Sequence, residues 1–477
     1  MSGTRGPSSL RTVLLAGTVP VAAMLVSCSS GSNPGSAPTK TAGLRTVTTS
    51  VPPFATSTTT VQSRTPADTW GTYDRDVART GNDPSSPRVS NPRPEWTSVD
   101  LDGSVYAQPL VIGSTVIAAT ENNTVYSLDV RSGRVNWSHH LASPVSGSSL
   151  RCGNIDPSGI TGTPVADAAT HALWVVTFSS PFAHTLWEID LGSGRVLGAR
   201  PADPPGSDPS TEQQRGALTL SSGRVYIPYG GLYGDCGKYH GWLVGLSATS
   251  PANRTMVTYE TPATGAGIWA PGGPVVDGAG DIFVATGNGV PVDVPGDANS
   301  VIKLDPSLNV LGRFTAPDFQ NLSATDTDLG SVSPIITAGG DVLQVGKEGT
   351  GYLLGPNLGS PLQTLHVCSG GFGAAATTAD NIYLSCFDGL YALDNRDAGH
   401  LSPTWAATGI KPGPPIVSGG AVWTVDRSGA LDGFSETTGK MVYTYPVTVA
   451  GSFPTLCADA GKLLVSDGNR IIAFGGV

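Results

Sequence analysis

The sequence predicts an all-β fold, an eight-bladed β-propeller of four-stranded antiparallel blades, and three observations support this prediction. Short apolar runs of strand length, separated by turn residues, follow one another along residues 109–477. This pattern recurs eight times, at a spacing of about forty residues. The last copy lacks its fourth strand, whereas a spare strand-like run precedes the first copy. Strands from both ends of the chain can therefore close the ring, which leaves no long unpaired edge.

The first copy, residues 109–137, shows the pattern most clearly. Its four apolar runs are separated by Gly-Ser, by Glu-Asn-Asn, and by a turn that runs from an Asp to a Gly. Eight similar copies suit radial closure better than the alternatives, which are a pair of β-sandwiches or another β-solenoid. The copies begin near Pro109, Gly162, Leu218, Pro274, Pro334, Ala374, Pro415 and Pro454, and the spare run is Glu95–Leu101.

The charge balance argues against nucleic-acid binding. The chain has 27 Lys and Arg residues against 37 Asp and Glu residues, so its formal net charge is −10. Only 13% of its residues are charged. A nucleic-acid-binding surface needs a positive excess that this composition does not supply.

The first 28 residues have the features of an export signal. Arg5 and Arg11 supply a positive start, and Val13–Val26 is an apolar stretch that Pro20 interrupts. The segment ends Leu-Val-Ser-Cys at Cys28, which resembles the lipobox of bacterial lipoproteins. The resemblance implies cleavage before Cys28 and a diacylglycerol on its sulfur, so we expect a lipid anchor in the bacterial cell membrane. An ordinary secretory signal is the alternative.

Residues 29–69 are rich in Ser, Thr, Pro and Gly, and large apolar side chains are scarce among them. Such a segment cannot bury enough apolar surface to order itself, so we expect a tether. Together, the anchor and the tether predict that the propeller, residues 70–477, lies on the extracytoplasmic face of the membrane.

The five remaining cysteines suggest a disulfide arrangement, because export allows disulfides to form. In a propeller blade, the loop that enters the innermost strand and the loop between the second and third strands lie on one face. Cys152, Cys236, Cys368 and Cys386 all fall in or beside such loops, in two neighbouring sets. We therefore expect the pairs Cys152–Cys236 and Cys368–Cys386, with Cys457 free and buried.

A second motif links neighbouring blades. Turns that run from an Asp or a Ser to a Gly four residues later, as in Asp129–Gly133, precede the outer strands that carry Trp137 and Trp405. With Trp70–Asp76 ahead of the first copy, this motif resembles the tryptophan-docking repeat of quinoprotein propellers. Those are the alcohol dehydrogenases that depend on pyrroloquinoline quinone (PQQ), and their non-catalytic relatives, which include a lipoprotein that helps assemble outer-membrane barrels.

The same resemblance implies a site on blades four and five. Trp269 matches the Trp that forms the floor under the quinone, and Asn288, in a Thr-Gly-Asn turn, matches a calcium ligand. Asp328 matches the catalytic Asp, which would be a further calcium ligand here, and Lys347 matches the cation that contacts the quinone. Propeller geometry places all four on one rim. There a carboxylate beside calcium could act as the general base on an alcohol while the quinone takes the hydride.

The chain also departs from this family. The family's Glu ligand on blade three has no clear counterpart, and Asp235 is the nearest substitute for it as a metal ligand. An adjacent Cys-Cys pair and a Cys-x-x-Cys-His haem site are both absent from the sequence. Calcium prefers six to eight oxygen ligands, whereas the sequence suggests only three side chains.

Two classes of function follow. The first, which these departures favour, is a lipid-anchored binding or scaffold propeller that recognises an extracellular protein, a glycan or a small molecule. The alternative is a dehydrogenase for alcohols or sugars that depends on PQQ and calcium, which the residues Trp269, Asn288, Asp328 and Lys347 favour.

Overall fold

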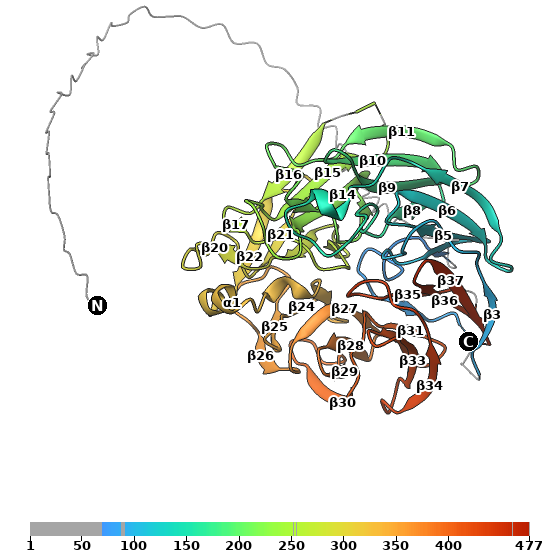
Figure 1. Ribbon diagram of the computed structural model, residues 1–477. Coiled ribbons are helices and arrows are strands. Elements are labelled where there is room, and N and C mark those ends of the chain that lie inside the picture. Colours follow the sequence, from blue (N-terminus) through green and yellow to red (C-terminus); the bar gives the residue numbers. More distant parts are fainter. Residues whose placement is uncertain (1–68, 87–90, 251, 254, 460, 477) are drawn as a thin grey trace, which may run out of the picture. The chain divides into compact units, whose positions relative to one another are not determined.

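The computed structural model describes residues 69–86, 91–250, 252–253, 255–459 and 461–476. Within these residues the protein is nearly all-β, and eight sheets follow one another around a ring in chain order (Figure 1). This arrangement confirms the predicted eight-bladed propeller. Residues 1–68, which contain the predicted signal segment with Cys28 and almost all of the predicted tether, lie outside the described residues.

Each blade is built on four antiparallel strands, and a short strand from outside the repeat is added to three of the sheets. Blade 1 consists of β4 (Leu110–Ile112), β5 (Thr115–Ala119), β6 (Thr124–Asp129) and β7 (Val135–His140). Blade 2 consists of β8 (Val165–Asp167), β9 (Ala172–Ser179), β10 (Ala183–Asp190) and β11 (Val196–Pro201). Blade 3 consists of β13 (Thr219–Ser221), β14 (Arg224–Gly231), β15 (Trp242–Ser247) and β16 (Met256–Glu260). Blades 4 and 5 consist of β18 (Val275–Val276), β19 (Ile282–Ala285), β21 (Ser300–Leu304) and β22 (Val310–Thr315); and of β23 (Ile335–Ile336), β24 (Val342–Val345), β25 (Thr350–Leu354) and β26 (Gln363–His366). Blades 6 and 7 consist of β27 (Gly371–Thr377), β28 (Asn381–Cys386), β29 (Gly389–Asp394) and β30 (Ser402–Thr408); and of β31 (Ile416–Ser418), β32 (Ala421–Asp426), β33 (Ala430–Ser435) and β34 (Met441–Pro446).

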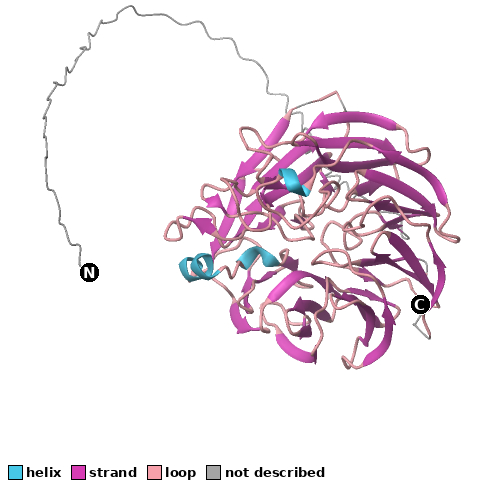
Figure 2. Ribbon diagram, in the orientation of Figure 1, coloured by secondary structure: helices cyan, strands magenta, loops and turns pink. Residues whose placement is uncertain are grey.

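The remaining elements are short. Figure 2 shows how little helix interrupts the strands. No helix in the described part of the chain is long and apolar enough to cross a membrane. These elements are β1 (Thr69–Trp70), β2 (Asn82–Asp83), β12 (Glu212–Gln213), β17 (Thr264–Gly265), β20 (Gly289–Val290), the helix α1 (Phe319–Thr325), and the 3₁₀ turns η1 (Gly147–Ser149) and η2 (Leu329–Ser331).

Blade 8 closes the ring with strands from both ends of the chain. Its three C-terminal strands are β35 (Leu456–Asp459), β36 (Lys462–Asp467) and β37 (Arg470–Gly475). Its outer strand is β3 (Arg93–Thr97), which pairs antiparallel with β37. The predicted spare run, Glu95–Leu101, therefore closes the ring as expected, although the strand begins two residues earlier and ends at Thr97.

Tryptophan side chains join neighbouring blades in a repeated geometry. The indole Nε1 of Trp137 donates to Leu191 O at 3.0 Å, and that of Trp405 donates to Glu436 O at 3.0 Å. Trp96, which the sequence analysis did not single out, does the same to Val130 O at 3.0 Å. Each ring lies against a glycine of positive φ, where a Cβ atom would overlap with the ring. The three glycines are Gly133, Gly194 and Gly439.

The segment ahead of β2 packs across the inner strands of the ring. Its backbone carbonyl groups accept hydrogen bonds from the first strands of four blades. The Arg79 guanidinium adds a bond to Leu218 O of blade 3, at 3.0 Å. This segment therefore ties together blades that are far apart in the sequence. The four carbonyl acceptors and their donors are Gly71 with Ala166, Val77 with Val276, Thr80 with Thr377, and Gly81 with Val417.

The cysteines pair as predicted. Cys152 is bonded to Cys236 and Cys368 to Cys386, whereas Cys457 is free and buried. Burial also raises the pKa of the Cys457 thiol well above its ordinary value, and the thiolate is the form that alkylating reagents attack. We expect Cys457 to resist iodoacetamide in the folded protein and to react only after unfolding in denaturant. Mass mapping of unreduced peptides would contradict the assignment if it found any other pairing.

Three buried carboxyl groups predict an unusual dependence of stability on pH. Burial raises the pKa of Asp74 to about 8, that of Glu121 to about 7 and that of Glu212 to about 8. The folded protein binds these protons more tightly than the unfolded chain does, in which such groups titrate near pH 4. The stabilisation that this tighter proton binding gives is complete below about pH 4. It is lost as the pH rises through the raised pKa values of the folded protein.

We therefore expect the melting temperature to fall as the pH rises from about 5 to 9, over the range that these shifts span. Replacing Glu121 with Gln, which mimics the protonated acid, should flatten part of this fall. Differential scanning calorimetry across this range is the measurement. A melting temperature that rises with pH, or a Glu121→Gln profile as steep as that of the wild type, would contradict the prediction.

Candidate active site

A cavity of about 510 Å³ opens among the loops of several blades. Its volume is within the range of about 300–1,000 Å³ that small-molecule sites occupy. Segments of blades 3 to 6 and of blade 8 supply its walls, together with Asn154 from the loop that enters blade 2. All five residues that the sequence analysis proposed for the site line this cavity: Asp235, Trp269, Asn288, Asp328 and Lys347.

Backbone hydrogen bonds hold these loops in register. Gly287 N donates to Gly267 O at 3.0 Å, and Lys347 N donates to Asp328 O at 2.9 Å. Gly287 also allows a close approach in the site, because a Cβ atom there would lie 2.5 Å from an Asp328 carboxylate oxygen and 2.9 Å from Trp269 Nε1. The glycine of the Thr-Gly-Asn turn therefore sets the spacing between the Trp ring and the carboxylate.

Asp328 is a buried carboxylate, and each of its two oxygens has a bonding partner. Its Oδ1 accepts from the backbone N–H of Asn288 at 2.8 Å, and its Oδ2 lies 2.5 Å from Lys347 Nζ. Burial raises the pKa of Asp328, and the Lys347 ammonium and the Asn288 amide offset part of this rise. The group is therefore shifted towards the range in which a carboxylate is an effective general base.

Lys347 lies at the centre of the charged groups. Its Nζ also contacts Asp326 Oδ1 at 3.0 Å and lies 5.5 Å above the Trp269 ring. Burial acts to lower the pKa of Lys347, but Asp328 and Asp326 outweigh it, so the pKa is raised and the ammonium keeps its charge. The site therefore holds a fixed positive charge between two carboxylates and an aromatic face.

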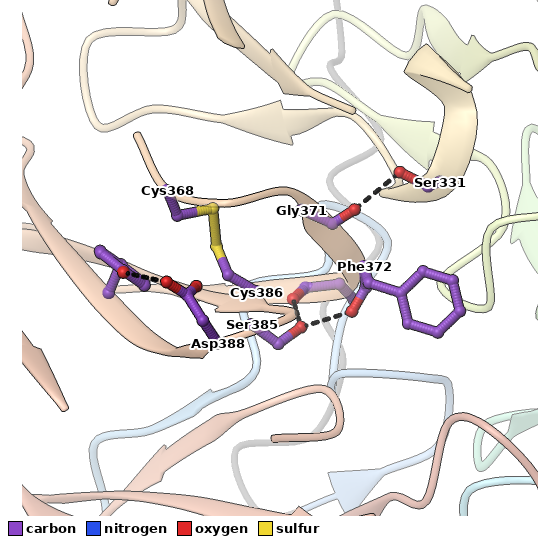
Figure 3. Close-up of a disulfide and its surroundings, with 9 residues drawn as sticks. Ser331, Cys368, Gly371, Phe372, Ser385, Cys386 and Asp388 are labelled. Atoms are coloured by element: carbon purple, nitrogen blue, oxygen red, sulfur yellow. Dashed lines mark hydrogen bonds between the residues drawn. A yellow bond between two sulfur atoms is a disulfide. The ribbon is translucent and has the colours of Figure 1, made fainter. Parts of the chain in front are cut away.

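Aromatic rings form one wall of the cavity. Trp269 lies 6.2 Å, centroid to centroid, from both Phe372 and Phe453, which are themselves 4.4 Å apart. The Cys368–Cys386 disulfide holds the end of β28 close to the start of β27, and the Phe372 ring points away from it (Figure 3). Ser385 Oγ donates to Phe372 O at 2.8 Å, which fixes the backbone that carries this ring.

The wall and its charges suit a planar organic anion such as PQQ. The cavity offers an aromatic floor at Trp269 and the Lys347 ammonium, and a Cβ atom at Gly287 would fill part of the space between the floor and Asp328. These features are those that a flat, carboxylate-bearing ring system needs for stacking and charge pairing. The residues present therefore fit a quinone cofactor of this class.

The same residues do not form a complete calcium site by themselves. Among the residues that the structure describes there is no cluster of three or more His, Cys, Asp or Glu side chains arranged for a metal. Asn288 Oδ1 already accepts from Asn299 at 3.2 Å, and Asp235 Oδ1 accepts from Tyr239 Oη at 2.6 Å. Since calcium prefers six to eight oxygens, the protein alone supplies too few. These residues therefore do not by themselves fit a calcium ion.

Several residues that line the cavity were missed in the sequence. Phe372 lies at the start of β27 and Phe453 in the loop before β35, both without a motif, and Arg215 follows a long loop that the repeat does not cover. Asp326 precedes Asp328 by two residues, and its side chain is 74% exposed, compared with 8% for Asp328. Of these two neighbouring carboxylates, the buried one is Asp328, which the family resemblance had matched to the catalytic Asp.

Comparison with known proteins bears out the fold. A family model described as outer membrane protein assembly factor BamB matches residues 93–228. Quinohemoprotein alcohol dehydrogenase from Comamonas testosteroni superimposes with a TM-score of 0.67 at 14% identity, over 86% of this chain and 80% of that one. At this identity the likeness shows a shared β-propeller fold.

Two curated proteins resemble this chain over most of its sequence. The polyvinylalcohol dehydrogenase of Pseudomonas sp. is 24% identical over 458 residues, which span 80% of this chain and 67% of that protein. The polyvinylalcohol dehydrogenase of Sphingopyxis sp. (strain 113P3) is 25% identical over 452 residues, which span 79% and 64%. The chain thus spans about two thirds of the length of these relatives.

Proposed function

We propose that the chain is a quinoprotein-type alcohol dehydrogenase whose cofactor and substrate share the cavity beside Trp269. The observation that carries this proposal is the buried Asp328 carboxylate, fixed by the Lys347 ammonium and the Asn288 amide at the edge of an aromatic floor. Perturbed carboxylates in a cavity with stacking surfaces are typical of catalytic sites. The names of the two curated relatives agree with this class of reaction.

The chain's own residues divide the work of such a reaction. Asp328 takes the proton of the substrate hydroxyl. The hydrogen bond from Asn288 N and the ion pair with Lys347 hold its carboxylate in one orientation. Lys347 keeps a positive charge beside the Asp328 carboxylate, where it would attract an anionic cofactor. Trp269, Phe372 and Phe453 exclude water and orient flat or apolar groups. When bound, PQQ supplies the acceptor for the hydride of the alcohol carbon.

A scaffold role remains the second candidate, because the matched family model, over residues 93–228, is described as an assembly factor. We propose for either role that a lipid on Cys28 anchors the chain outside the bacterial cell membrane. Partition of the full chain into a detergent phase, compared with that of a Cys28→Ala variant, tests the anchor. Equal partition of the two proteins would refute it.

The test of the dehydrogenase is dye-linked oxidation of alcohols by the full chain. The protein is incubated with PQQ, with and without calcium, and a panel of primary, secondary and polymeric alcohols is added with an artificial electron acceptor. We expect dye reduction that requires both PQQ and an alcohol. Tight PQQ binding without dye reduction would leave a cofactor pocket without catalysis, and the absence of both would favour the scaffold.

A further inference from the structure

Arg215 lies between two hollows of the propeller. It follows β12 and precedes β13 on blade 3, and its side chain lines both the large cavity and a smaller inner chamber. Its guanidinium stacks on the Phe453 ring at 4.6 Å, so an aromatic side chain from blade 8 fixes the plane of the group. The cation is therefore held in place at the inner boundary of the cavity.

The guanidinium lacks polar partners. Arg215 Nε is buried and has no hydrogen-bond acceptor among the described residues, and no ion pair to this side chain is found in that part of the chain. Arg79 and Arg200 each also have one guanidinium nitrogen without an acceptor, but their other nitrogens are bonded: Arg79 donates to Leu218 O at 3.0 Å and Arg200 donates to Ser247 O at 2.6 Å. A guanidinium carries five N–H donors, and leaving the Nε–H of Arg215 unmatched away from water costs stability. Unmatched donors of this kind are expected in a binding site, because a bound ligand supplies the missing acceptors and offsets their cost.

Glu121 is the acid that acts most strongly on the charge of Arg215, but it is a poor counter-ion. Glu121 Oε2 accepts from Gly159 N at 2.7 Å and from Thr161 Oγ1 at 3.1 Å, and no ion pair joins this carboxyl to Arg215 within the described residues. Burial raises the pKa of Glu121 to about 7, so much of this group is protonated at neutral pH. The positive charge of Arg215 is therefore not neutralised by the protein.

The inner chamber cannot hold the missing anion. Its volume is about 20 Å³, which is room for about one water molecule. Hydroxyl groups line most of it, from Tyr73, Tyr106, Thr161, Thr163 and Thr455. The anion must therefore reach Arg215 from the large cavity, where Trp269, Phe372 and Phe453 favour a flat ring system.

We infer that Arg215 binds a carboxylate group of a planar organic anion held in the large cavity. The guanidinium fork matches the two oxygens of a carboxylate, and the Phe453 ring holds this fork in position. The inference rests on the proposed function only in naming PQQ as one source of the carboxylate. A planar aromatic acid that is not a cofactor is the other source of the same chemistry.

The test measures binding of two probes to the full chain, by equilibrium dialysis and by tryptophan fluorescence. The probes are PQQ and benzene-1,3,5-tricarboxylate, which is planar and carries carboxylates but has no quinone. The variants are Arg215→Met, Arg215→Lys and, as a matched control, Arg427→Met. Arg427 also stacks on phenylalanine rings, 5.1 Å from Phe372 and 5.9 Å from Phe387, but does not line the cavity.

We expect Arg215→Met to weaken binding by about tenfold to a hundredfold. Arg215→Lys should have a smaller effect, and Arg427→Met should bind as the wild type does. The ligand-free Arg215→Met protein should melt at the same temperature as the wild type or at a higher one, because it loses an unmatched cation. A merely structural Arg215 would give the opposite pattern, a lower melting temperature with unchanged binding.

The outcomes separate this inference from the proposed function. Arg215-dependent binding of PQQ supports both and identifies the cofactor as the source of the carboxylate. Arg215-dependent binding of the tricarboxylate alone supports the inference and argues against the quinoprotein activity. Wild-type binding of neither probe, or equal binding by wild type and Arg215→Met, overturns the inference.

Discussion

Replacing Asp328 with Asn is expected to lower kcat for alcohol oxidation by about 10²–10⁴-fold, the usual contribution of a positioned general base. The amide keeps the shape of the carboxylate and can still accept from Asn288 N, but it cannot take a proton from the substrate. Dye-linked turnover of the full chain with PQQ measures the change. Binding of PQQ, followed by fluorescence, should remain, since the floor at Trp269 is untouched.

Asp326→Asn is the matched control for this prediction. Both carboxylates contact Lys347, at 3.0 Å from Asp326 and 2.5 Å from Asp328, but only Asp328 is buried. The exposed acid should contribute little to the reaction, so we expect a change in kcat of less than about tenfold, as for a solvent-screened charge pair. Equal losses from the two variants, or full turnover by Asp328→Asn, would show that Asp328 is not the base.

Replacing Trp96 with Ala is expected to lower the free energy of unfolding by about 3–5 kcal/mol, the range for removing a buried tryptophan. Trp96 is 9% exposed, donates to Val130 O of blade 1 and sits on the strand that closes blade 8. Its loss therefore leaves a hollow at the junction between the first and last blades. Unfolding in urea, followed by circular dichroism, measures the effect.

Trp96→Phe serves as the control for packing. It keeps an aromatic ring against Gly133 but removes the N–H donor, so we expect a much smaller loss, about 1 kcal/mol for the hydrogen bond together with part of the ring's packing. If Trp96→Ala were as stable as the wild type, the closing strand would not depend on this docking contact.

The fold could be predicted from the sequence because its determinants are local and repeated. Each copy carries its own turns, and the Asp129–Gly133 and Asp190–Gly194 turns form the surfaces on which Trp96 and Trp137 dock. Ring closure followed from counting strands, since the last copy was one strand short. The role of Trp96 was missed because its partner lies on a different copy of the repeat.

The site was predictable only in part. Trp269, Asn288, Asp328 and Lys347 were brought together by propeller geometry, which assigns their loops to one face. The position of Lys347 between two carboxylates depends on side-chain packing that no sequence spacing encodes. Arg215 escaped notice because its environment is made by Phe453 of blade 8, which only the closed ring brings near blade 3.

The most direct test of the central claim, that the cavity beside Trp269 is a cofactor site, is a crystal structure of the full chain with PQQ. We predict that the planar ring lies against Trp269, with Asp328 and Lys347 at its edge and a carboxylate group at Arg215. Density for PQQ on another surface would contradict the claim, as would a saturated crystal whose cavity holds only solvent.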